Sequence, residues 1–170
     1  MAKNAHSALP PAVCGFKLEL PGWAADLARA TVEPMPDLED RVAFAIELAR
    51  LNVRHATGGP FGAAVFDLNT HRLLSVGVNR VAPTACGAAH AEIVALSLAQ
   101  KRLGHFSLAA DPARACELVS STEPCTMCKG ATAWSGVRAL VCAAADADAR
   151  AVGFDEGPRV TDWVEAFERR

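Results

Sequence analysis

The chain has 170 residues, of which 51 % are hydrophobic and 21 % are charged, and its formal net charge is −2. This length suits one compact globular domain, and the near-neutral charge disfavours nonspecific nucleic-acid binding, which needs many basic side chains. No apolar run is long enough to span a membrane, and the first residues lack the apolar core of a signal peptide, so we expect a cytoplasmic protein.

The first 36 residues hold five of the ten prolines, and we expect them to form an arm that packs on a domain formed by residues 37–170. A helix is predicted from Asp37, a candidate cap, to the glycine pair at 58–59, which would end it. The apolar residues that recur at helical spacing in this segment are Val42, Ile46, Ala49 and Val53.

The central part of the chain predicts alternating strands and helices. Strands at 61–67 and 73–79 are separated by a short polar loop, which favours an antiparallel hairpin. The later elements are a helix at 88–104, a strand at 116–121, a helix at 125–135, a strand at 137–145 and a short C-terminal amphipathic helix. This order predicts an α/β protein, a three-layer α/β/α sandwich with a mixed central sheet of four to five strands.

Three of the chemically reactive side chains have the spacing of a metal site. The six cysteines could pair, but the absence of an export signal disfavours disulfides. Cys125 and Cys128 form a C-x-x-C motif at the start of a predicted helix, and His90 lies near the start of another. Zinc prefers nitrogen and sulfur ligands, and three protein ligands leave a fourth position for water, as in catalytic sites.

Glu92 lies two residues after His90 in an otherwise apolar run, which makes a solvated helix face a poor explanation for it. A carboxylate beside a zinc-activated water can take up the proton of that water and deliver it to a substrate. The combination of H-x-E with a later P-C-x-x-C is the signature of zinc-dependent deaminases. The sequence therefore predicts one zinc ion and one acid–base glutamate.

With these motifs, the chain resembles the cytidine deaminase-like superfamily, within it the branch of guanine deaminases and tRNA adenosine deaminases. The matching stretches lie at 58–65 (GGPFGAAV), 77–80 (GVNR), 90–96 (HAEIVAL) and 123–131 (EPCTMCKGA). The resemblance implies zinc bound by His90, Cys125 and Cys128, and proton transfer by Glu92. It also implies that Asn79 hydrogen-bonds the base, while Phe61 and the backbone near Ala63 form the wall of its pocket.

The stretch VGFDEGP at 152–158 resembles a segment that guanine and ammeline deaminases carry over the active site and that the tRNA enzymes lack. By this resemblance Glu156 is a second proton-transferring glutamate, and an ordinary loop acid is the alternative. The resemblance implies hydrolysis of guanine to xanthine and ammonia, a small nucleobase as the binding partner, and a homodimer.

Several alternatives remain open from the sequence. The family's fifth strand and closing helix are expected to be absent, through truncation, a four-stranded sheet or completion by a partner. A tRNA adenosine deaminase would need a basic face, which the acidic run at 146–149 disfavours. Another base, a nucleoside or an amino-triazine could be the substrate. A structural zinc module would need Cys86 as a fourth ligand, and would leave Glu92 unexplained.

Overall fold

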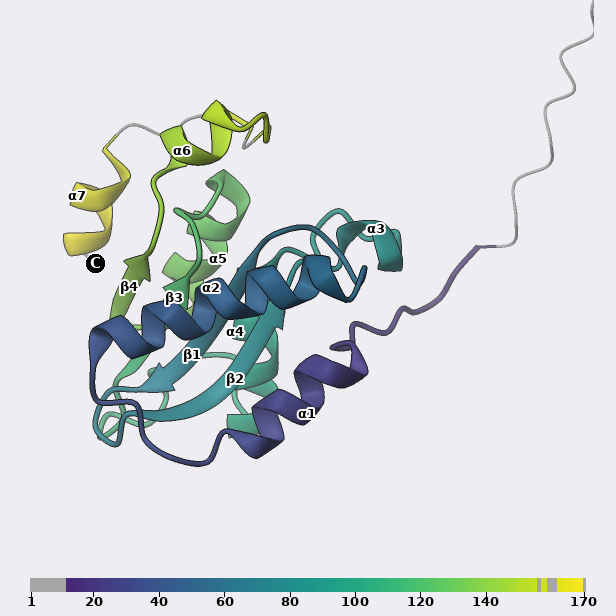
Figure 1. Ribbon diagram of the computed structural model, residues 1–170. Helices are drawn as coiled ribbons and strands as arrows, with labels where there is room; N and C mark the ends of the chain where they lie inside the picture. The colour runs from purple at the N-terminus through teal and green to yellow at the C-terminus, as the bar shows by residue number, and fades with distance from the viewer. Residues whose placement is uncertain (1–11, 156, 159–161, 170) are drawn as a thin grey trace, which may run out of the picture.

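The computed structural model describes residues 12–155, 157–158 and 162–169 (Figure 1). The strands are β1 (Gly62–Asp67), β2 (Arg72–Val78), β3 (Cys116–Ser120) and β4 (Ala139–Cys142). The helices are α1 (Gly22–Ala30), α2 (Leu38–Arg54), α3 (Val81–Thr84), α4 (Ala91–Leu103), α5 (Thr126–Ser135), α6 (Asp146–Ala151) and α7 (Trp163–Glu168). Among the described residues, no helix is both long and apolar enough to cross a bilayer.

The four strands form one mixed sheet in the order β2-β1-β3-β4. Strand β1 is antiparallel to both β2 and β3, whereas β3 and β4 are parallel. Strands β2 and β3 therefore run in the same direction, as the crossover through α4 requires. The predicted hairpin and the predicted mixed sheet are both confirmed, and among the described residues the sheet has four strands, the lower of the two expected numbers.

Two apolar clusters cover the two faces of the sheet, as alternation along β1 shows. Ala63 and Val65 pack with residues of α4, whereas Ala64 and Phe66 pack with residues of α2 on the opposite face. Every residue of β1 is buried, as expected for a strand covered on both sides. The predicted three-layer sandwich is therefore confirmed, with α2 in front of the sheet and α4 behind it in Figure 1.

Helix α2 is found where the sequence predicts it, but only part of its predicted apolar stripe, Val42 and Ala49, faces the core. Ile46 and Val53, two of the apolar residues at helical spacing, are 47 % and 52 % exposed. The buried stripe consists of Arg41, Ala45, Leu48, Ala49 and Asn52. Two polar residues can be buried there because each has partners; Arg41 Nε, for example, donates to Glu117 Oε2 at 2.8 Å.

The segment before α2 contains a helix that the proline-rich sequence does not suggest. Helix α1 packs Trp23 and Leu27 against the cluster on the α2 side of the sheet. The indole nitrogen of Trp23 donates a hydrogen bond to Thr57 Oγ1 at 3.0 Å, next to the end of α2. A further helix that was not predicted, α6, lies in the acidic run after β4.

Gly77 in β2 allows α4 to approach the sheet very closely. A Cβ atom at this position would lie 2.0 Å from the carbonyl oxygen of Ala91 and 2.5 Å from the backbone nitrogen of Ala95. Any side chain would therefore push the first turn of α4 away from β2. That turn follows His90 and contains Glu92, so the close approach fixes the place of both residues relative to the sheet.

Candidate metal centre and active site

The predicted metal ligands lie at the end of the sheet where strands β2, β3 and β4 terminate. His90 is the cap residue at the start of α4, and Cys125 is the cap residue at the start of α5. Both have extended backbone conformations, so each helix begins directly after a predicted ligand. Pro124 precedes α5, and its missing N–H costs nothing there. The positive ends of two helix dipoles thus meet beside the sulfur atoms.

The side chains of His90, Cys125 and Cys128 form a compact group of possible metal ligands. Their ligand atoms all lie within 4.8 Å of one another, and Cys125 Sγ is 3.6 Å from His90 Nδ1. Sulfur and nitrogen ligands of one tetrahedral zinc ion are separated by roughly 3.6 Å, given bonds of about 2.3 and 2.0 Å. The donor atoms and their spacing therefore fit zinc.

Cys86, the fourth ligand that a closed structural site would need, is not part of this group of ligands among the described residues. It lies in the loop between α3 and α4, where its backbone N–H donates to Val81 O at 3.2 Å. Three protein ligands therefore leave a coordination position for water, as in a catalytic site.

The two cysteines differ strongly in acidity. The hydrogen bond from Cys128 lowers the pKa of Cys125 to about 4, with further help from His90. The same hydrogen bond, together with burial, raises the pKa of Cys128. Zinc binds cysteine as the thiolate, so a divalent ion held here would keep both sulfurs deprotonated.

Glu92 is 5 % exposed and lies directly beside a predicted ligand. Cys128 Sγ lies 3.4 Å from Glu92 Oε2, so the carboxyl group reaches the metal group from the first turn of α4. Burial raises the pKa of Glu92, which favours the protonated form. A carboxyl group with a raised pKa next to a metal site is suited to exchanging protons near neutral pH.

The residues predicted to contact the base lie at the same end of the sheet. Asn79 follows β2, and its backbone N–H donates to Phe61 O at 3.1 Å. The side chains of both residues border Gly59, where a Cβ atom would be 3.4 Å from Asn79 Oδ1 and 3.7 Å from the Phe61 ring. Ala63 is fully buried in β1 and shares a cluster with Ala91. Their roles in binding a base stay predictions.

Asn52 holds the loop at Gly59 and the residue after β2, Asn79, in place. Its sequence context does not indicate this role. It is fully buried, and its Nδ2 donates to Gly59 O at 2.8 Å and to Asn79 O at 2.9 Å. Its Oδ1 accepts from Thr57 Oγ1 at 2.8 Å. In the sequence Asn52 is one polar residue in a helix, and its function depends on contacts between distant segments.

The segment after α6 reaches the same place. The ring of Phe154 lies edge-on against that of Phe61, with 5.0 Å between the ring centroids and 76° between the planes. Glu156, predicted to be a second proton-transferring residue, lies outside the described residues. The sequence does not indicate this contact, because no local pattern pairs Phe154 with Phe61.

An open three-ligand zinc position beside a buried carboxyl group is the arrangement of a hydrolytic zinc enzyme. Residues 35–144 match the family model of the cytidine and deoxycytidylate deaminase zinc-binding region. The chain therefore belongs to this deaminase family, and zinc is its cofactor.

Three relatives illustrate the similarity. The structure of a guanine deaminase from Nitrosomonas europaea is 46 % identical, covers 95 % of this chain and 87 % of its own, and superposes with a TM-score of 0.87. Guanine deaminase of Bacillus subtilis is 38 % identical over 112 residues, 66 % of this chain and 67 % of that protein. The tRNA-specific adenosine deaminase of Haemophilus influenzae is 33 % identical over 116 residues, 68 % of this chain and 62 % of that protein.

Proposed function

We propose that this deaminase acts on free guanine, which it hydrolyses to xanthine and ammonia. Water adds its oxygen to the amino-bearing ring carbon, and the bond from that carbon to the exocyclic nitrogen breaks. Two guanine deaminases are among the relatives with high identity, and the chain is similar to one of them over most of its length.

The observation that carries the choice of guanine is the contact between Phe154 and Phe61. It brings the VGFDEGP segment, which resembles a segment of guanine deaminases, to the predicted wall of the base pocket. A flat ring beside these two aromatic side chains would gain stacking or edge contacts. Long RNA would instead meet the acidic side chain of Asp148, which is exposed in the first turn of α6.

Zinc bound by His90, Cys125 and Cys128 would supply Lewis-acid activation of water. Glu92 would take one proton of that water and pass it to a ring nitrogen. It would later move the second proton, from the new hydroxyl group, to the exocyclic nitrogen, which leaves as ammonia. Asn79 has both a donor and an acceptor to offer the polar edge of the base. Glu156 would assist proton transfer at the exocyclic amine.

We also propose a cytoplasmic homodimer. The thiolate ligands need a reducing compartment to stay unoxidised, which the cytoplasm supplies. Strand β4 is at an edge of the sheet, and an edge strand is a ready site for association. Sedimentation of the zinc-loaded chain at several concentrations tests the dimer, and a concentration-independent monomer would contradict it.

The substrate is tested by ammonia release from the zinc-loaded protein with guanine, adenine, cytosine, guanosine, an amino-triazine and a tRNA anticodon stem. We expect rapid release from guanine and little from adenine, cytosine or the stem. We expect Glu156→Gln to slow guanine turnover without loss of zinc. Fast deamination of the stem beside inert guanine would favour a tRNA adenosine deaminase instead.

A further inference from the structure

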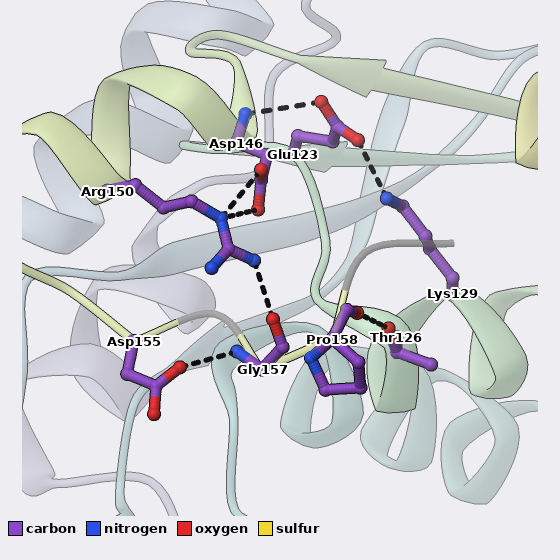
Figure 2. Close-up of polar contacts among 8 residues, drawn as sticks. All are labelled: Glu123, Thr126, Lys129, Asp146, Arg150, Asp155, Gly157 and Pro158. Carbon is purple, nitrogen blue, oxygen red and sulfur yellow. Dashed lines mark hydrogen bonds and ion pairs between the residues drawn. The ribbon is translucent and has the colours of Figure 1, made fainter. Parts of the chain in front are cut away.

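A chain of polar contacts connects the metal-bearing end of α5 with the segment after α6 (Figure 2). Glu123, two residues before Cys125, accepts from Lys129 Nζ at 2.7 Å through Oε1. Its other oxygen accepts from the backbone N–H of Asp146, the first residue of α6, at 3.2 Å. One carboxylate thus fixes the start of α6 relative to the first turns of α5.

Arg150 continues this chain from α6 to the following segment. Its Nε donates to both oxygens of the Asp146 carboxylate, at 3.0 and 2.8 Å. Its Nη2 donates to the carbonyl oxygen of Gly157 at 2.8 Å. Figure 2 shows the guanidinium between these two partners. The Arg150 and Asp146 side chains are 28 % and 16 % exposed, so this ion pair is partly shielded from water.

A second contact holds the same segment directly on α5, the helix that begins after Cys125 and contains Cys128. Thr126, the first residue of α5, donates through its hydroxyl to Pro158 O at 2.5 Å. Arg150 and Thr126 thus hold two successive carbonyl groups, those of Gly157 and Pro158, while Phe154 contacts Phe61 at the other end.

We infer that Arg150 is a positioning residue, which holds the segment of residues 154–155 and 157–158 beside the predicted base pocket through its bridge from Asp146 to the Gly157 carbonyl. The inference rests on the proposed function, since it places this segment at the base. Only an arginine can make both contacts at once, because its planar fork presents separate N–H groups to the carboxylate and the carbonyl. Lysine in this position can neutralise Asp146 but cannot bridge both.

The inference predicts a specific kinetic signature. If Arg150→Gln lets the segment leave the pocket for most of the time, only the closed fraction binds guanine well. The apparent affinity then falls in proportion to that fraction, so we expect KM to rise about tenfold while kcat changes little. A purely structural role would instead reduce the amount of active protein, and would lower kcat at unchanged KM.

The test compares zinc-loaded wild type, Arg150→Gln and Arg150→Lys, with Arg50→Gln as the control. Arg50 makes a similar ion pair with Glu47 at 2.6 Å, but on the exposed face of α2. In both Arg150 variants we expect about tenfold faster hydrogen exchange at the Phe154 and Gly157 amides, because the closed state is depopulated. The zinc content of both Arg150 variants, and the exchange rates of the control Arg50→Gln, should remain like those of wild type.

Unchanged exchange in both Arg150 variants, or a fall in kcat at unchanged KM, would overturn the inference. Should Arg150→Gln fold poorly, Arg150→Lys keeps the charge beside Asp146 and still removes the bridge. The exchange measurement needs no substrate, so it judges the role of Arg150 even if wild type releases no ammonia from guanine. That latter result would instead reject the proposed substrate.

Discussion

Glu92 Oε2 lies 3.4 Å from Cys128 Sγ, which places a buried carboxyl group in direct contact with a predicted zinc ligand. Two segments separated by 36 positions in the chain make this contact, each at the beginning of a helix. The contact explains why an otherwise apolar helix carries a glutamate in its first turn. A proton donor and acceptor is needed there, within reach of the metal and of the reacting base.

The first prediction concerns proton transfer by Glu92. Glutamine keeps the size of the side chain but cannot accept the proton, so Glu92→Gln should lower kcat by at least about 10²-fold. The zinc content should stay at one ion per chain, because Glu92 is not one of the predicted zinc ligands. Steady-state ammonia release and metal analysis of the same preparation measure both quantities. Near-normal turnover would remove Glu92 from the mechanism.

The second prediction separates a catalytic from a structural zinc site. Cys128→Ala should lose zinc, whereas Cys86→Ala should bind it like wild type, because Cys86 lies outside the ligand group. Wild type and Cys86→Ala should both release zinc as the pH falls, since protons compete with the metal for the thiolate and imidazole ligands. Metal analysis after dialysis over a pH series measures this. Zinc loss in Cys86→Ala would indicate a closed, four-ligand site.

The third prediction tests the aromatic contact at the pocket. Phe154→Ala removes an edge-on ring pair worth about 0.5–1.5 kcal/mol, so KM for guanine should rise roughly two- to tenfold. The zinc content should not change, because Phe154 is not among the predicted ligands. Phe106→Ala is the matched control, since that phenylalanine is 78 % exposed and lies near the other end of α4. Equal KM values in the two variants would contradict a role of Phe154 at the base.

The fourth prediction concerns the buried amide of Asn52. Asn52→Ala leaves the carbonyls of Gly59 and Asn79 without its N–H groups, which should lower the free energy of unfolding by about 2 kcal/mol. Urea denaturation of the zinc-loaded protein measures this loss. Asn69→Ala is the control, because Asn69 donates to Ala113 O at an exposed site and should change stability by less than about 0.5 kcal/mol. Equal losses of unfolding free energy in the two variants would contradict the contacts assigned to Asn52.

The features that could be predicted from the sequence are local ones. Helix α4 ends at Gly104 in a left-handed conformation, as expected from the glycine, and α5 begins directly after the Pro-Cys pair. The three ligands and Glu92 could be proposed because short motifs set their spacing along each helix. Their approach across 35 positions could be expected only from the chemistry of a shared metal ion.

Other features depend on contacts between segments that carry no motif. The buried face of α2 contains Arg41 because Glu117 in β3 and the carbonyls of Met35 and Pro36 receive its hydrogen bonds. Hydrophobic periodicity cannot identify such a residue, since burial of a charge depends on its partners. The bridge by Arg150 is similar, because its role depends on a carbonyl group, which every residue possesses.

The most direct test of guanine hydrolysis follows the oxygen atom. Zinc-loaded protein is incubated with guanine in water enriched in oxygen-18, and the purine product is analysed by mass spectrometry. The account predicts xanthine carrying one labelled oxygen at the carbon that bore the amino group, with one ammonia released per xanthine. Unchanged guanine, or xanthine without the label, would contradict hydrolytic deamination of this base.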